Sequence, residues 1–315
     1  MIVTVTVNPA LDRTVVLDGP LRPGQVQVAA SVREDAGGKG INVSRVLAAA
    51  GQPTRAVLPL AADDPLRTAL AAQQLDVRAV ATAGHCRTNI ALTDPAGVTT
   101  KVNLPGTAFS PAEADALVAA VVVAAEHARW LVLAGSLPPS VPDDFYVTLI
   151  RAVREKWQDA APRVAVDTSG AALQAVVEHA RPDLIKPNDD ELAELTGMAP
   201  DGADLVPASL SAARTLVPAR VGAALVTLGA AGTLLVTEGG AFATAAPRIQ
   251  VRSTVGAGDS ALAGYLLAET AGRPPEQCVV SATRHGAAAA SLPGTRVPRP
   301  QDLPTDDLPV QHFPF

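Results

Sequence analysis

Short apolar, β-branched runs alternate with longer helix-like stretches along most of this 315-residue chain. The runs stand at residues 2–8, 54–60, 129–135, 163–169, 183–188 and 223–229. Their central positions are mostly apolar, which is typical of strands buried on both faces of a parallel sheet. The alternation therefore predicts an α/β fold, with one mostly parallel sheet covered by helices on both sides. From Pro293 onward, the proline-rich chain is expected to form an extended surface tail.

Two segments interrupt this alternation with strands that have no helix between them. Residues 11–34 carry strand-like stretches at 14–17 and 26–32. Residues 87–103 carry two alternating strands around Asp-Pro-Ala-Gly, which is typical of a hairpin. Both segments adjoin polar motif residues, so one joint small sheet is favoured over two unrelated surface hairpins. The predicted division is an α/β domain of residues 1–10, 35–86 and 104–315 and a β-sheet lid of residues 11–34 and 87–103.

The composition argues against several classes of protein. The formal net charge is −6, so the chain lacks the basic excess expected of a nucleic-acid binder. Two cysteines, Cys86 and Cys278, cannot form a disulfide framework, which favours a reducing compartment. The sequence shows no signal-peptide pattern, and we find no uniformly apolar run long enough to span a bilayer. We therefore expect a cytoplasmic protein that binds neither nucleic acid nor membranes.

The segment STVGAGDS at residues 253–260 lies between an extended run and a helical stretch. A glycine loop at a helix start presents free backbone N–H groups at the positive end of the helix dipole, where anions bind. Gly256 and Gly258 let this backbone approach a ligand closely. Asp259 would repel a bound phosphate, so we expect it to accept the proton of a substrate hydroxyl, although helix capping is the plainer alternative.

Other polar residues stand at strand ends or glycine turns. A second glycine turn opens a helix where Lys39 could contact a phosphate and Asn42 could hydrogen-bond hydroxyls. Asp12 follows the first strand, at the edge where open α/β sheets bind ligands. Asn188 and Glu191 match a capping pair, and the same oxygens could face hydrated Mg²⁺. Each feature alone also fits a turn or a cap, so only their occurrence together is specific.

Taken in order, the stretches GGKGINVSR (37–45) and STVGAGDS (253–260) resemble the ribokinase-like, or pfkB, family of carbohydrate kinases, over essentially the whole chain. The segments TVNPALD, CRTNIAL, TKVNLPG and LAGSLPP are most similar to the 1-phosphofructokinase and tagatose-6-phosphate kinase branch. The resemblance implies a three-layer α/β/α fold with a small β-sheet lid, which in relatives often pairs subunits into a homodimer.

The resemblance also implies the reaction. ATP, with Mg²⁺, would phosphorylate a phosphorylated ketohexose, with fructose 1-phosphate favoured over tagatose 6-phosphate and fructose 6-phosphate. Lys39 and Arg87 argue against a neutral sugar, because two buried cations would then have nothing to pair with. A sugar-phosphate sensor without turnover is an alternative from another class, and Asp259 argues against it because a pure binder needs no base.

Each matching residue receives an implied role. Asp259 would take the proton of the attacking hydroxyl, and the backbone of Gly256, Ala257 and Gly258 would hold the transferred phosphoryl group. The other implied sets are Asp12, Gly38, Asn42 and Asn103 for the sugar hydroxyls; Lys39, Arg87 and Ser136 for the phosphate already on the sugar; Asn188 and Glu191 for Mg²⁺; and Lys186, Thr227, Gly229 and Gly232 for the nucleotide. Cys86 departs from the pattern, since relatives commonly have threonine before the arginine. Residues 24–31 offer no basic residue for a phosphate contact across subunits.

Overall fold

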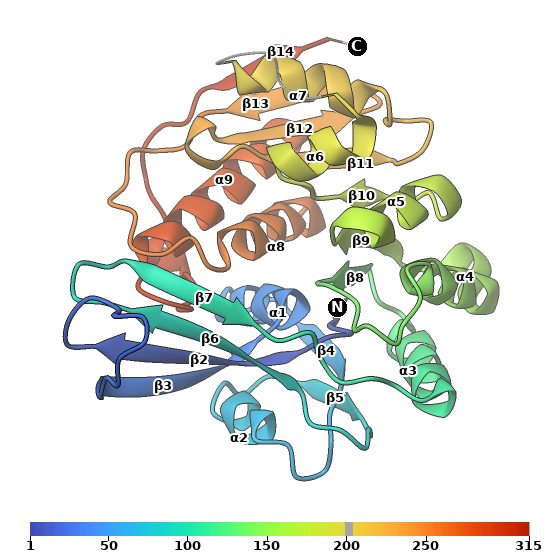
Figure 1. Ribbon diagram of the computed structural model, residues 1–315. Helices are drawn as coiled ribbons and strands as arrows, with labels where there is room; N and C mark the ends of the chain where they lie inside the picture. The colour runs from blue at the N-terminus through green and yellow to red at the C-terminus, as the bar shows by residue number, and fades with distance from the viewer. Residues whose placement is uncertain (199–203, 315) are drawn as a thin grey trace.

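The computed structural model describes residues 1–198 and 204–314. Among these residues, the strands of the main sheet are β1 (Ile2–Val5), β4 (Thr54–Pro59), β5 (Val77–Val80), β8 (Trp130–Ala134), β9 (Arg163–Asp167), β10 (Leu184–Ile185), β11 (Ala223–Thr227), β12 (Thr233–Thr237), β13 (Gly240–Thr244) and β14 (Val310–Phe313). Their order across the sheet is β14-β13-β12-β11-β10-β9-β8-β1-β4-β5 (Figure 1). The neighbouring strands β5, β4, β1, β8, β9, β10 and β11 run parallel to one another. This confirms the predicted parallel sheet.

The remaining strands continue the sheet in antiparallel fashion at one edge. β12 pairs with β11 in a hairpin, β13 pairs with β12, and β14 pairs with β13. The expectation of a surface tail from Pro293 is therefore wrong for residues 310–313. These residues add an edge strand because β13 offers its free backbone edge, and Phe313 packs against the core cluster beside β12 and β13.

Helices cover both faces of the sheet, so the fold has the predicted three layers (Figure 1). One face carries α3 (Pro111–Ala124), α4 (Phe145–Trp157), α5 (Gly170–His179), α6 (Asp189–Thr196) and α7 (Leu205–Arg214). The other carries α1 (Lys39–Ala49), α2 (Leu66–Ala71), α8 (Ala257–Thr270) and α9 (Pro275–Ser291). Short 3-10 helices occupy Gln158–Ala160, Gly229–Ala231 and Pro300–Asp302. In the described ranges, none of these helices combines the length and the apolarity that a membrane crossing requires.

The core explains why the strands are apolar at successive positions. Neighbouring side chains on a strand point to opposite faces. Val3 and Val5 pack with α3 and α4, whereas Ile2 packs with α1, α8 and α9. Side chains on both faces of the strand are therefore buried. Each fully buried aliphatic side chain contributes about 1.5–3 kcal/mol to the stability of the fold.

A second sheet stands beside the main one. It comprises β2 (Ala10–Leu17), β3 (Ala29–Gly37), β6 (Arg87–Thr93) and β7 (Thr99–Asn103), in the order β3-β2-β6-β7. β2 and β6 pair in parallel, so the two inserted segments form one joint sheet (Figure 1). β3 starts later than the expected 26–32 and continues to Gly37, directly before α1.

The strand register gives the second sheet two unlike faces. Asp12, Asn89 and Asn103 stand opposite one another, so they share a face. Arg87 lies on the same face because it stands two residues before Asn89 on β6. The opposite face carries Val15, Val32, Ile90, Leu92 and Val102, together with the exposed ion pair of Arg13 and Glu34. The polar face leads into the site described next.

Candidate active site

The starts of α1 and α8 and the carboxyl end of β9 bring charged side chains together. Lys39, in the first turn of α1, places its Nζ 2.8 Å from Asp167 Oδ1 at the end of β9. Lys186, which follows β10, places its Nζ 3.4 Å from Asp167 Oδ2. Asn42 Nδ2 donates to Asp259 Oδ2 at 2.8 Å, which joins α1 to α8. The carboxyl edge of the sheet is where ligands bind in open α/β folds.

The first turn of α8 has the conformation expected of an anion site. Gly256 precedes the helix with φ +74°, a left-handed conformation that favours glycine. A Cβ on Gly258 would stand 3.2 Å from Lys186 Nζ, so the lysine lies close against this backbone. Free N–H groups at a helix start and an adjacent ammonium both attract phosphate.

The pKa values of the two buried carboxylates of this cluster are shifted in opposite directions. Burial, and next the charge of Asp167, raise the pKa of Asp259 to about 6, against the lowering effects of Lys39, Asn42 and Lys186. Burial would raise the pKa of Asp167 too, but Lys186 and Lys39 together hold it below its ordinary value. Asp259 is therefore ionised at neutral pH and is a stronger base than an ordinary aspartate.

The polar face of the second sheet supplies another group of side chains. Asn89 Nδ2 donates to Asp12 Oδ1 at 2.8 Å, and burial raises the pKa of Asp12. A Cβ on Gly37 would lie 2.2 Å from Asp12 Oδ2, so any larger residue there would displace the Asp12 carboxylate. Arg87 Nη1 donates to the carbonyl of Leu104 at 3.1 Å. These contacts fix Asp12 and Arg87 before any ligand binds.

Several buried polar atoms around this site lack a hydrogen-bond partner among the described residues. They are Arg87 Nε, Asn89 Oδ1, Thr6 Oγ1 after β1 and Thr168 Oγ1 after β9. A buried polar group without a partner costs about 1–3 kcal/mol. A bound polar ligand or ordered water would pair with these atoms.

A cavity of about 780 Å³ opens beside the first turn of α8. Its lining includes most of the residues expected to bind the nucleotide or to flank it, namely Asn188, Thr227, Gly229, Gly232, Ala257 and Gly258. Its walls are largely apolar and include Ile249 and small residues of α8 and α9. This volume and lining suit a nucleotide, since ligand pockets commonly measure about 300–1,000 Å³.

Some expected site residues lie apart or have structural partners. Asn188 and Glu191 cap α6, because Asn188 Oδ1 accepts from the Glu191 N–H at 2.7 Å and Glu191 Oε2 accepts from the Asn188 N–H at 2.9 Å. Ser136 is exposed, and its Oγ accepts from Asn8 Nδ2 at 3.3 Å. Asn103 is exposed at the end of β7. Lys186 stands against Gly258 and is not part of the cavity lining.

Four polar residues that the structure places around this site were not predicted from the sequence, namely Asp167, Thr168, Thr6 and Asn89. A signal was present for Asp167 and Thr168, because both directly follow the apolar run of β9. Asp12 was identified on that same ground, its place after the first strand, and the reasoning applies equally to these two. The partners of Asn89 depend on the pairing of β2 with β6, which the sequence does not state.

Comparison with known proteins agrees with this geometry. Residues 7–302 match the family model for the pfkB family of carbohydrate kinases. The chain is 36% identical over 309 residues to 1-phosphofructokinase of Rhodobacter capsulatus, covering 96% of this chain and 94% of the relative. It is 31% identical over 300 residues to ATP-dependent 6-phosphofructokinase isozyme 2 of Escherichia coli, covering 94% of each. Escherichia coli phosphofructokinase-2 in complex with substrates and products superposes with a TM-score of 0.87 and 30% identity, over 96% of each chain. The chain therefore belongs to the pfkB family of carbohydrate kinases.

Proposed function

We propose that this chain transfers the γ-phosphoryl group of ATP to the C6 hydroxyl of fructose 1-phosphate, forming fructose 1,6-bisphosphate and ADP. The position of Asp259 carries the proposal. Its carboxylate is joined to Asn42 on the side of the second sheet, while Ala257 and Gly258 of the same helical turn line the large cavity. A sugar hydroxyl and a nucleotide phosphate would therefore meet beside Asp259.

The reaction follows from these positions. The hydroxyl oxygen attacks the γ-phosphorus, the bond from that phosphorus to the β,γ-bridging oxygen breaks, and ADP leaves with the electron pair. The hydroxyl proton passes to Asp259, whose pKa of about 6 keeps it ionised at neutral pH. The N–H groups at the start of α8, together with Lys186, would stabilise the charge on the transferred group.

The oxygen donors near the nucleotide cavity fit Mg²⁺. Asn188 and Glu191 supply an amide and a carboxylate oxygen, and the buried Asp167 Oδ2 lies 3.4 Å from Lys186 Nζ. Within the described residues, no group of three or more histidine, cysteine or acidic side chains could hold a metal alone. Mg²⁺ commonly keeps several waters and takes further ligands from substrate phosphates, so two or three protein oxygens would suffice to hold it. When bound, Mg²⁺ would neutralise charge on the phosphates.

The phosphate already on the sugar would lie between Lys39 and Arg87. Burial lowers the pKa of Arg87, and the charge of Asp12 opposes that change, so the guanidinium stays charged and is poorly solvated. Its unpaired Nε would bind a phosphate oxygen. The match to 1-phosphofructokinase of Rhodobacter capsulatus supports fructose 1-phosphate as this substrate. We place the reaction in the cytoplasm, where both substrates occur.

The outer face of the second sheet would pair two copies of the chain. It carries Val15, Val32, Ile90, Leu92 and Val102, of which Val32 is 57% and Val102 50% exposed. Exposed apolar side chains gathered on one face beside an ion pair are typical of an interaction site. We propose a homodimer in which these faces meet and the sheets act as lids over the sites. Sedimentation should give a dimer for the native chain and a monomer for Val32→Glu.

An ADP-release assay tests the reaction. The panel is fructose 1-phosphate, tagatose 6-phosphate, fructose 6-phosphate and free fructose, each with ATP and Mg²⁺, and Asp259→Asn is the control. We expect the highest kcat/KM with fructose 1-phosphate. The similarity to 6-phosphofructokinase isozyme 2 makes fructose 6-phosphate the second candidate. A preference for a 6-phosphate would keep the base and reverse the orientation of the sugar, whereas turnover with none would favour a sensor.

A further inference from the structure

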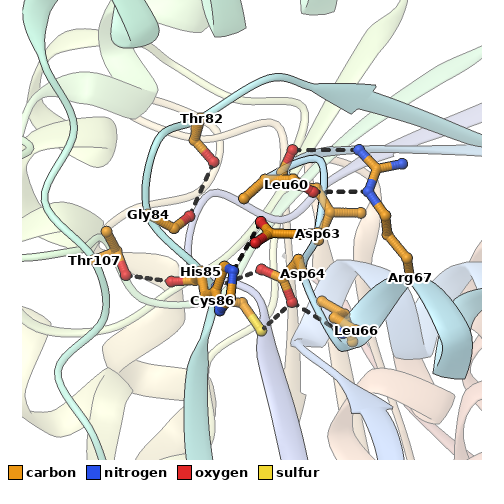
Figure 2. Close-up of polar contacts among 11 residues, drawn as sticks. Leu60, Asp63, Asp64, Leu66, Arg67, Thr82, Gly84, His85, Cys86 and Thr107 are labelled. Carbon is orange, nitrogen blue, oxygen red and sulfur yellow. Dashed lines mark hydrogen bonds and ion pairs between the residues drawn. The ribbon is translucent and has the colours of Figure 1, made fainter.

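Asp64 is buried in the loop between β4 and α2 and holds two separate segments together (Figure 2). Its Oδ1 accepts a hydrogen bond from the Leu66 N–H at 2.9 Å, at the start of α2. Its Oδ2 accepts from the Cys86 N–H at 2.6 Å, and the Cys86 thiol donates to Oδ1 at 3.3 Å. A carboxylate that is 2% exposed needs such donors, because burial without partners is costly.

The start of α2 is held in place by the core, and this fixes the position of the Asp64 carboxylate. Leu66 is fully buried in a cluster that also contains Leu11 and Leu58. Arg67 holds the preceding loop, because its Nε donates to the Ala61 carbonyl at 2.7 Å. Figure 2 shows Arg67 bonded to the loop backbone and the Asp64 carboxylate bonded to Leu66 and Cys86. The position of Asp64 is therefore fixed by the core rather than by solvent-exposed contacts.

Cys86 connects Asp64 to Arg87, the next residue along the chain. Cys86 packs against the cluster of Leu11 and Leu66, and the next residue, Arg87, begins β6 on the face that carries Asp12. Adjacent residues on a strand point to opposite sides, so fixing Cys86 also sets the direction of Arg87. Burial, and next the charge of Asp64, raise the pKa of Cys86 to about 12, so the thiol remains a donor.

We propose that Asp64 is a positioning residue for substrate binding: it ties the start of α2 to the start of β6, so that the Arg87 guanidinium meets the phosphate already on the sugar. The inference rests on the role of Arg87 under the proposed function. The exposed neighbour Asp63 is a built-in control. It holds the same loop through one surface contact, from its Oδ1 to His85 Nε2 at 2.9 Å.

The first test compares Asp64→Asn with Asp63→Asn in steady-state kinetics. Asparagine preserves the size of the side chain but turns an NH₂ group toward one of the donors. We expect Asp64→Asn to raise the KM for fructose 1-phosphate about tenfold, with kcat and the KM for ATP changed less than about twofold. Asp63→Asn should change none of them beyond about twofold. A fall in kcat with unchanged KM would overturn the proposal.

A double-mutant cycle with Arg87→Ala separates this inference from the proposed function. If Asp64 acts through Arg87, Asp64→Asn raises the KM no further once Arg87 is alanine. Additive effects would overturn the inference, as would a normal KM in Asp64→Asn while Arg87→Ala alone raises it. If Arg87→Ala alone leaves the KM unchanged, the assigned role of Arg87 is wrong, and the inference falls with it.

Asp64→Ser keeps the proposal testable if the asparagine variant does not fold. Serine at this position can still accept a hydrogen bond from the Leu66 N–H two residues later, as serine does in turns. Its side chain is too short to hold Cys86 at the same time. The same rise in KM is therefore expected. The melting temperature of Asp64→Ser should be closer to that of the native chain than the melting temperature of Asp64→Asn. A native KM in a folded Asp64→Ser would contradict the proposal.

Discussion

The helices α1 and α8 begin alike but carry opposite charges. Each follows a glycine with positive φ, +126° at Gly38 and +74° at Gly256, and Asn42 joins them through its bond to Asp259. α1 opens with Lys39, whereas α8 has Asp259 in its first turn. The helix dipole alone would disfavour the lysine and favour the ionised aspartate.

The structure reverses both expectations. The pKa of Lys39 lies above its ordinary value, because Asp167 outweighs the opposing effect of burial. Burial and Asp167 raise the pKa of Asp259 despite its place at a helix start. A single carboxylate from β9 therefore acts on both helix starts, although burial is the larger cause at Asp259. The helix dipole is the weaker effect here, since it contributes about 0.3–1 kcal/mol at exposed sites.

The largest expected effect comes from Asp259→Asn. The substitution removes the proton acceptor and keeps the shape of the side chain. We expect kcat to fall by about 10²–10⁴-fold, with modest changes in the KM for either substrate. Asp190→Asn is the matched control, because Asp190 is an exposed acid in the first turn of α6. Near-normal turnover of Asp259→Asn in the ADP-release assay would remove the assignment of the base.

Lys39→Ala, at the start of α1, should change substrate binding rather than turnover. We expect the KM for fructose 1-phosphate to rise about 10–100-fold, while the KM for ATP changes less than about threefold, because a charged contact to the sugar phosphate is lost. Lys156→Ala, at an exposed lysine of α4, is the control. If ATP binding weakened equally, Lys39 would belong to the nucleotide side of the site.

The pH dependence tests the control that Asp167 exerts over Asp259. The base must be ionised, so kcat/KM should rise with pH, reach half its plateau near pH 6 and level off about one pH unit above that. Asp167→Asn removes a negative charge that raises this pKa and releases Lys39 and Lys186 toward Asp259. We expect the acid limb to move down by about one pH unit, whatever the loss in absolute rate. A limb that stayed in place would show that burial alone raises the pKa.

The sequence was sufficient for the fold wherever burial dictated the pattern. Parallel strands such as β1 and β8 are buried at every position and almost entirely apolar, because helices cover both sides. The strand β14 escaped prediction because prolines precede it and Val310 and Phe313 are only half-buried. Its pairing depends on the free edge of β13, which becomes known only once the chain has folded.

The candidate site was predictable in its residue types and less so in its contacts. Glycine turns before helices pointed to Lys39 and Asp259. The partner of Lys39, Asp167, lies 128 residues away in sequence, so no local pattern connects them. The capping pair Asn188 and Glu191 illustrates the opposite difficulty. Its two oxygens serve a helix start and suit Mg²⁺ equally, and residue types cannot separate these uses.

The glycines that precede the two helices give the smallest and sharpest comparison. A Cβ on Gly38 would lie 2.6 Å from Thr6 Cγ2, whereas the nearest atom to a Cβ on Gly256 is 3.9 Å away. Gly256→Ala should therefore lower the free energy of unfolding only by its backbone strain, about 1–2 kcal/mol. Gly38→Ala should lower it by more, because steric overlap with Thr6 is added.

Chemical denaturation of both variants measures this difference, with Gly51→Ala as the control. Gly51 has φ +77° and open space around its Cβ, so its loss should equal that of Gly256→Ala. Its kinetics should stay native, whereas Gly256→Ala alters the backbone proposed to bind the transferred phosphoryl group. Equal losses for Gly38→Ala and Gly256→Ala would show that Thr6 yields to the added methyl group, and the close packing of α1 on β1 would then not explain the glycine.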